Sequence, residues 1–180
     1  MKPYTPQSMA PAVAPRPYAA GFTMIELLIV IFIAAILAGL SAPLFTQFTR
    51  NQRIKAATSE LTYALTLARG EATKRNVDVV VEPHEDGWQV GWTVTADGAA
   101  EPLLVHEAPG YDDGGTRVNY LSITGPDDVT YNGVGRLVAA PDAPFEIESA
   151  DGPSTGAKTR CVTLDLSGMP RSRVSNTGGC

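Results

Sequence analysis

Two arginines near the end of the chain, Arg171 and Arg173, have the type and spacing that best suit a binding role. Residues two apart on an extended segment point to the same side, and guanidinium groups match phosphate oxygens. Lys158 and Arg160 lie close in sequence to the base of this segment. These cations predict a tail that contacts phosphate groups. The alternative is a solvated basic hairpin that offsets an acidic body.

Histidine and carboxylate side chains could also bind a metal ion. They occur together in the stretch "PHEDG", which contains His84, Glu85 and Asp86, and at His106 and Glu107. We interpret "PHEDG" as a solvated turn, and the neighbouring pair Asp112 and Asp113 does not match a calcium loop. The sequence also lacks a nucleophile elbow, a phosphate loop and a dinucleotide fingerprint. We therefore expect no metal, no cofactor and no enzymatic activity.

The two cysteines, Cys161 and Cys180, are too few for a zinc site built on cysteine. Outside the cytoplasm such a pair favours a disulfide. Closing a loop of this length stabilises a protein by roughly 3 kcal/mol in the chain-entropy model. The bond would tie the tail to the last predicted strand. The alternative is that Cys180 stays free or forms a disulfide with another chain.

The charges that surround these residues are distributed unevenly. Residues 50–75 carry six basic and two acidic side chains, a net charge of +4. Residues 76–157 carry fifteen acidic side chains and two arginines, a net charge of −13. Residues 158–180 carry four basic side chains and one aspartate, a net charge of +3. An acidic body does not favour a polyanion as a whole, whereas the basic tail could bind one locally.

A long apolar run, "GFTMIELLIVIFIAAILAGLSAPLF", occupies residues 21–45. It is long enough to span a bilayer, which takes about 20 apolar residues. Lys2 and Arg16 precede it without any acidic residue. This positive-inside bias predicts that residues 1–21 lie in the cytoplasm and that the rest of the chain lies outside.

Glu26 is the only charged residue between Met24 and Leu40. A lone carboxylate at membrane depth is costly, and such residues usually have a partner. No lysine or arginine lies within a helical turn or two of it. A cut after Gly21 would give Phe22 a new amino terminus four residues away, and that cation could pair with Glu26 of the same chain or of a neighbour.

The stretch "GFTMIE" followed by a long apolar helix resembles the N-terminal signature of type IV pilins and of type II secretion pseudopilins. The resemblance implies cleavage after Gly21 by a prepilin peptidase and N-methylation of Phe22. It also implies that Glu26 acts in subunit docking during assembly. The alternative interpretation is a plain signal anchor with an accidental glutamate.

Periodicity predicts the elements that position these residues. We expect a leader at 1–21, a membrane and filament-core helix at 22–45 with a bend at Pro43, and an amphipathic helix at 46–76 that stops at Asn76. A β-rich head with a disulfide-tied tail follows at 77–180. The apolar stripe of the second helix is Ile54, Ala57, Leu61, Ala64, Leu65, Ala68 and Ala72.

After Asn76 the apolar period changes to two, which indicates strands. Trp88, Val90, Trp92 and Val94 alternate with polar or small residues, so we expect both tryptophans in the core. The segments "HEAPGYDDGGT" and "ADGPSTGAKT" are interpreted as loops. The fold class is therefore α+β, with one long helix against an antiparallel β head. Its strands are expected at 77–81, 88–95, 103–106, 117–123, 129–132, 145–148 and 161–166.

The segments "LTYALTLARGEATKRN", "DGWQVGW" and "VTYNGVGRL" resemble the GspH/FimT group of minor pilins and pseudopilins, which includes FimT/FimU-type proteins. This resemblance implies a filament subunit that starts in the inner membrane, has a periplasmic head, and has a prepilin peptidase and other major and minor pilins as partners. It also implies a role in priming or at the tip. The tail resembles the Gly-Arg-x-Arg element of FimT-type pilins that support DNA uptake in natural transformation. Pro170 stands where that element has glycine, and Gly168 comes two positions earlier.

Overall fold

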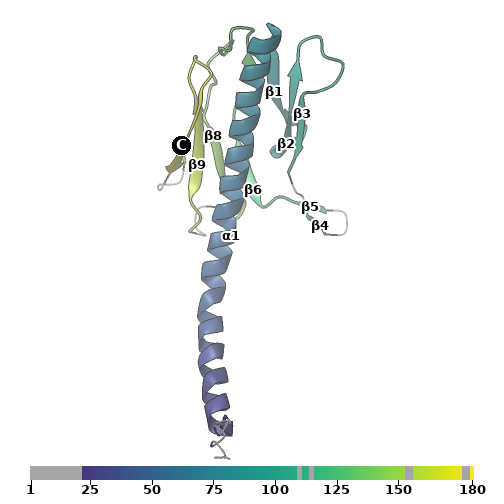
Figure 1. The fold of residues 1–180 in the computed structure, drawn as a ribbon. Helices are drawn as coiled ribbons and strands as arrows, with labels where there is room; N and C mark the ends of the chain where they lie inside the picture. Colours follow the sequence, from purple (N-terminus) through teal and green to yellow (C-terminus); the bar gives the residue numbers. More distant parts are fainter. Residues whose placement is uncertain (1–21, 109–110, 114–115, 153–155, 176–178) are drawn as a thin grey trace, which may run out of the picture. The chain divides into compact units, whose positions relative to one another are not determined.

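The computed structural model describes residues 22–108, 111–113, 116–152, 156–175 and 179–180, without the side chains of 40–44 and 111–118 (Figure 1). The predicted leader at 1–21 lies outside these ranges. The chain divides into two compact units, Met1–Ser41 and Ala42–Cys180.

A single helix assignment, α1 (Met24–Arg75), extends over 52 residues and continues through Pro43. In the first unit it begins with a cap, since the Glu26 N–H lies 3.3 Å from the Thr23 hydroxyl and the Leu27 N–H donates to the Thr23 carbonyl at 3.1 Å. The large apolar side chains from Met24 to Leu37 are exposed. Within the part of the chain that the structure describes, no helix combines the length and apolar character needed to cross a membrane.

The helix ends where the sequence predicted. Asn76 has a φ of 55°, the left-handed conformation that commonly closes a helix, and asparagine tolerates it better than most residues. Glu71 accepts hydrogen bonds from Lys74 at 2.9 Å and from Arg75 at 2.7 Å in the last turns. These bonds lower the pKa of Glu71.

In the second unit α1 buries one narrow stripe against the sheets. All seven residues predicted for this stripe, from Ile54 to Ala72, are buried. Four of them are alanines, which let the helix approach the strands closely. Both tryptophans of the predicted core strand, Trp88 and Trp92, are buried in the same cluster.

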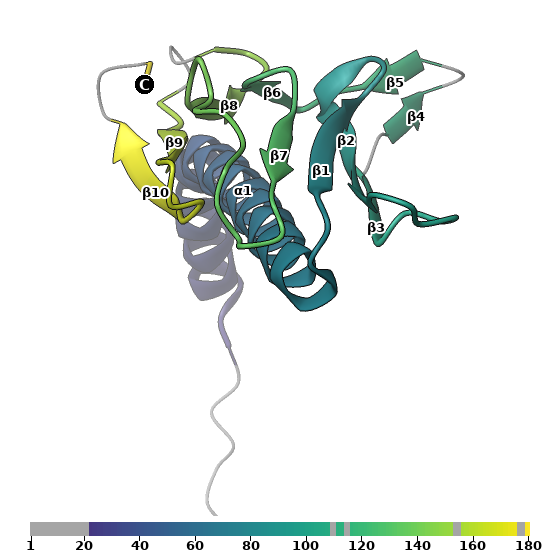
Figure 2. The same cartoon turned by 90° about the horizontal axis from the view of Figure 1, so that it is seen from above.

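Two four-stranded sheets line the helix, and every pairing in them is antiparallel. Figure 2 shows β9 and β10 on one flank of α1 and β1, β2 and β3 on the other. The first sheet has the order β3-β2-β1-β7 and the second β10-β9-β8-β6. The strands are β1 (Val79–His84), β2 (Gly87–Ala96), β3 (Leu104–Glu107), β6 (Leu121–Thr124), β7 (Val129–Tyr131), β8 (Phe145–Ser149), β9 (Thr159–Leu164) and β10 (Pro170–Ser175).

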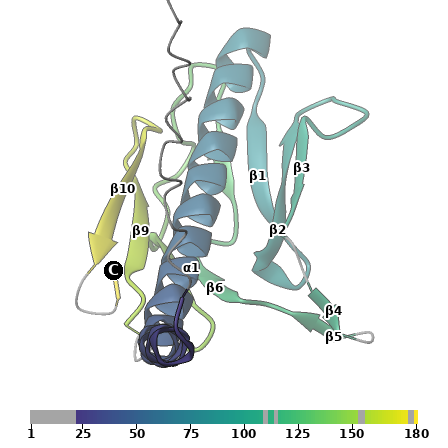
Figure 3. The ribbon, with the colours of Figure 1, turned by 60° about the horizontal axis from the view of Figure 1, so that its bottom comes forward.

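Between residues 106 and 123, two sequence predictions were wrong in detail. The strand expected at 117–123 is divided into β5 (Thr116–Val118) and β6, because β5 pairs with β4 (Tyr111–Asp113) whereas β6 pairs with β8. β4 also lies inside the segment interpreted as a loop. The glycines and aspartates of this segment are typical of loops, although its backbone pairs with β5. The β4–β5 hairpin is visible beyond the end of β6 in Figure 3.

Candidate interaction site at the C-terminal hairpin

The predicted arginine pair lies on β10, a strand that the sequence pattern did not predict. In the β9–β10 ladder Arg171 is opposite Thr163 and Arg173 is opposite Cys161. Because residues two apart on a strand share a face, the two arginines project from the same side, and both are exposed. The spacing argument therefore gave the correct relative direction.

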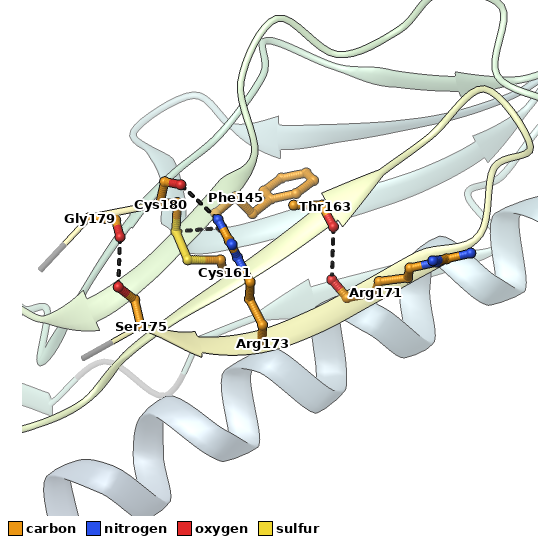
Figure 4. Close-up of a disulfide and its surroundings, with 8 residues drawn as sticks. All are labelled: Phe145, Cys161, Thr163, Arg171, Arg173, Ser175, Gly179 and Cys180. Atoms are coloured by element: carbon orange, nitrogen blue, oxygen red, sulfur yellow. Dashed lines mark hydrogen bonds between the residues drawn. A yellow bond between two sulfur atoms is a disulfide. The ribbon is translucent and has the colours of Figure 1, made fainter. Parts of the chain in front are cut away.

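A disulfide joins Cys161, which is buried, to Cys180 and so returns the end of the described chain to β9 (Figure 4). The Arg173 guanidinium donates a hydrogen bond to the Cys180 carbonyl oxygen at 2.8 Å. The Ser175 hydroxyl donates to the Gly179 carbonyl oxygen, also at 2.8 Å. Arg173 is thus held by a group that the disulfide positions.

Arg171 has a different environment from Arg173. Figure 4 shows its guanidinium directed away from the disulfide. Its nearest acidic group is Asp165, at 4.0 Å between Nη2 and Oδ2, and 76% of its side chain is exposed. A surface pair at this distance contributes little, so Arg171 is the more available of the two cations.

Asp165 organises the turn that leads into β10. Its carboxylate accepts hydrogen bonds from the Ser167 hydroxyl and, at 2.9 Å, from the Ser167 N–H. These bonds to Ser167, with a smaller effect from the Arg171 charge, hold the pKa of Asp165 below its ordinary value. The Asp165 carbonyl accepts from the Gly168 N–H at 2.8 Å. The turn therefore closes through both the side chain and the backbone of Asp165.

Gly168 is required by the geometry of this turn. Its φ is +77°, and a Cβ placed there would lie 2.7 Å from Cε1 of Tyr131. The buried Tyr131 hydroxyl donates to the Gly168 carbonyl at 3.1 Å, and burial raises the pKa of Tyr131 well above its usual range. Pro170 begins the edge strand β10, where proline is tolerated. Gly168, two positions before Pro170, thus provides the positive φ that the turn before β10 requires.

Lys158 and Arg160 do not join the arginine pair. Arg160 is opposite Val174 in the ladder, whereas Cys161 is opposite Arg173. Cross-strand partners share a face and successive residues alternate, so Arg160 projects from the other side of the hairpin, toward α1. The hairpin therefore divides the four cations between its two faces, a separation that sequence proximity alone does not indicate. Lys158 and Arg160 instead line a separate cavity with residues of α1.

The two histidines, His84 and His106, each contact side chains or backbone of the fold. The Asp86 N–H donates to Nδ1 of His84 at 3.2 Å within the β1–β2 turn. The His106 ring stacks on Trp92 at 4.0 Å between centroids, and its Nε2 lies 3.5 Å from a Glu60 carboxylate oxygen. Among the described residues no three His, Cys, Asp or Glu side chains are arranged to hold a metal ion. The side chains of Asp112 and Asp113 lie outside the description.

The predicted processing site lies at the start of the first unit. Gly21 lies outside the described residues, and Phe22 is 76% exposed. Glu26 is exposed in the first turn of α1. The carboxylate of Glu26 thus lies four residues after Phe22, where cleavage would create an amino terminus.

Comparisons with known proteins agree with this architecture. Residues 16–42 match the prokaryotic N-terminal methylation motif, and residues 57–168 match the family described as type II transport protein GspH. A crystal structure of the type IV minor pilin FimU from Pseudomonas aeruginosa (strain PAO1), in space group P21, has a TM-score of 0.52 and 23% identity. That match covers 71% of this chain and 92% of FimU. A second FimU structure, in space group P65, has a TM-score of 0.50 and 22% identity over 67% and 91% of the two chains. No curated protein matches the chain.

The long helix, the antiparallel head and the N-terminal motif together define a pilin-type protein, a structural subunit rather than an enzyme. The chain belongs to the GspH family. With its N-terminal methylation motif, it is a membrane-anchored pilin-type protein that is processed by a prepilin peptidase and assembled with other pilins into a filament.

Proposed function

We propose that the chain is cleaved between Gly21 and Phe22, N-methylated on Phe22, and held in the inner membrane by a single span at residues 22–45. The head then lies in the periplasm until the helix is drawn into a type IV pilus or a type II secretion pseudopilus, where the subunit primes assembly or sits at the tip. The observation that carries this proposal is that one chain contains both the methylation motif at 16–42 and the GspH match at 57–168.

The side chains of the first unit support burial of this segment in lipid and later among other helices. Ile25, Leu28, Ile29 and Phe32 are each at least half exposed, although water disfavours such surface. Glu26 needs a partner in an apolar environment. The amino terminus of Phe22, created by cleavage, supplies a cation for the same chain or a neighbour.

Glu26→Gln tests the docking role in cells that contain the complete filament system. The variant keeps its size but cannot form the ion pair, so we expect normal cleavage and a several-fold loss of the subunit from sheared filaments. Glu101→Gln, on the exposed surface of the head, is the control and keeps normal incorporation. Wild-type incorporation of Glu26→Gln would rule out this role.

The priming or tip role has a separate test. Deletion of the gene is expected to reduce the number of filaments, and a label on the head is expected at one end of each filament. Unchanged filament numbers and labels along the whole length would contradict the role while leaving the assignment as a pilin intact.

A DNA-binding role for the tail is the second candidate, favoured by the shared exposed face of Arg171 and Arg173. The bond from Arg173 to Cys180 leaves Arg171 as the principal phosphate ligand. We expect Arg171→Gln with Arg173→Gln to abolish DNA binding by the detergent-solubilised chain at low salt, since salt-sensitive affinity reports phosphate contacts. Lys158→Gln with Arg160→Gln is the matched control, because it removes the same charge from the other face. If the wild-type chain shows no salt-sensitive binding, this role is wrong.

A further inference from the structure

A second basic site lies between α1 and the hairpin, on the face away from the disulfide. It is a cavity of about 270 Å³ between the helix and the β9–β10 edge of the second sheet. Lys55 comes from α1, Lys158 directly precedes β9, and Arg160 is the second residue of that strand. Phe48, Asn51, Gln52 and Val174 complete the lining.

The side chains of the three cations in this cavity have no hydrogen-bond or ion-pair partner among the described residues, unlike several other cations of α1. Within the described residues, no hydrogen bond or ion pair involves the side chain of Lys55, Lys158 or Arg160, and no acidic residue lines the cavity. Three like charges that line one cavity without a counter-charge repel one another. An anion from outside the chain would relieve that repulsion.

Other basic side chains of α1 in this unit show the contrast. Arg50 pairs with Asp151 at 2.7 Å, and Arg53 lies over the ring of Tyr120 at 4.1 Å. Lys74 and Arg75 both pair with Glu71. Lys55 differs because its neighbours across the cavity are cations.

The rest of the lining indicates the kind of anion that fits. Phe48 and Val174 are 59% and 40% exposed, so the site presents apolar surface beside its charges. The Lys158 N–H donates to the Asn51 carboxamide oxygen at 3.0 Å, which fixes one wall. Apolar surface beside cations suits an aspartate or glutamate flanked by apolar side chains, whereas each phosphate of a DNA backbone is flanked by deoxyribose groups and further negative charges.

We propose that this cavity receives a carboxylate from an acidic segment of a neighbouring filament subunit. The proposal rests on the proposed assembly of this chain with other pilins. The chain's own head shows that such acidic surfaces exist in this class of protein, since residues 76–157 carry a net charge of −13. The site is distinct from the arginine pair, because Val174 and Arg160 face one side of the hairpin and Arg173 faces the other.

Crosslinking in the assembled filament tests the proposal. A photoreactive benzoylphenylalanine replaces Val174 in the full chain, and crosslinked peptides are identified by mass spectrometry. We expect a crosslink to a pilin-type subunit within a peptide that contains aspartate or glutamate. Lys55→Glu with Lys158→Glu is expected to lower the crosslink yield roughly tenfold or more, because like charges would then face each other.

Matched variants separate charge from folding. Arg136→Glu, at an exposed position that does not line the cavity, is expected to leave the yield unchanged. Lys55→Gln with Lys158→Gln removes the two charges at exposed positions. We expect this variant to lower the crosslink yield less than charge reversal does, and it replaces the reversal variant if that variant does not fold. Reversal of the charge on the crosslinked acidic residue of the partner is expected to restore the yield with Lys55→Glu.

The outcomes distinguish this proposal from the proposed function. If the chain is processed and incorporated normally but the crosslink is insensitive to these charges, the cavity proposal alone is wrong. A crosslink to DNA or lipid at this position, or none at all in assembled filaments, would also overturn it. If the chain is neither processed nor incorporated, the proposed function itself fails.

Discussion

The guanidinium of Arg173 donates a hydrogen bond to the carbonyl oxygen of Cys180, at 2.8 Å, and Cys180 is held there by its disulfide to Cys161. The arginine opposite Cys161 in the β-ladder therefore also contacts the residue to which Cys161 is covalently joined. One consequence is that the disulfide controls both the stability of the head and the freedom of one of the two exposed arginines.

Loss of the disulfide is expected to destabilise the head. Cys180→Ser opens a loop of eighteen residues, which in the chain-entropy model costs roughly 3 kcal/mol of unfolding free energy. Chemical denaturation of the detergent-solubilised chain measures this change. Dithiothreitol should reduce the stability of the wild-type protein to a similar extent and leave Cys180→Ser unaffected. Equal stability of both proteins in oxidising buffer would contradict the prediction.

Tyr131→Phe removes the hydroxyl that joins β7 to the β9–β10 turn. The Gly168 carbonyl then loses its donor at a buried position, so we expect a loss of about 1–2 kcal/mol in unfolding free energy. Tyr63→Phe, at a side chain that is 61% exposed, is the control and should change the free energy by less than about 0.5 kcal/mol. Similar values for both variants would show that the bond to Gly168 is unimportant.

Gly168→Ala is expected to disturb the turn in two ways. Its positive φ disfavours a side chain by about 1–2 kcal/mol, and the added Cβ would meet the Tyr131 ring. Gly98→Ala is a matched control, since Gly98 has a similar φ of +72° with nothing within 4 Å of the added Cβ. Denaturation of both variants should show a clearly larger loss at Gly168, and an equal loss would mean that the ring contact costs nothing.

The Asp165 carboxylate predicts a pH dependence of stability. Its pKa is lowered in the folded protein, chiefly by the bonds from Ser167. Its stabilising effect is therefore present above the ordinary aspartate pKa of about 3.9 and is lost as the pH falls through the folded value. We expect the denaturation midpoint of the wild type to fall more steeply than that of Asp165→Ala below about pH 4.

The comparison between these two proteins isolates Asp165. Glu71 also has a lowered pKa, but its contribution is the same in both and cancels. Parallel acid profiles for the wild type and Asp165→Ala would contradict the role assigned to the Ser167 bonds.

Much of the fold follows from periodic patterns in the sequence. The stripe from Ile54 to Ala72 and the alternation from Trp88 to Val94 each mark one buried face, and all of their members are buried. Asn76 ends the helix because it tolerates a positive φ better than most residues. These features depend on residues that are close together in the sequence, so they can be predicted from the sequence alone.

The arrangement of the candidate sites depends on contacts between segments that are far apart in the sequence. The spacing of neighbouring residues does not predict such contacts. Gly168 is fixed by Tyr131, 37 residues away, and Lys55 meets Lys158 only because α1 packs beside β9. The separation of Arg160 from Arg173 follows from the β9–β10 register. The strand β10 itself was not recognised, because the arginines and serines of "PRSRVS" show no apolar alternation. The separation also requires the register between the two strands.

The most direct test of the account is the size and the amino terminus of the mature chain. Mass spectrometry of the protein purified from cells that contain a prepilin peptidase should show a chain that begins at N-methylated Phe22. Gly21→Val should accumulate as the unprocessed precursor that retains residues 1–21. A normal-sized mature protein from Gly21→Val, or a wild-type chain that retains its leader, would contradict the account.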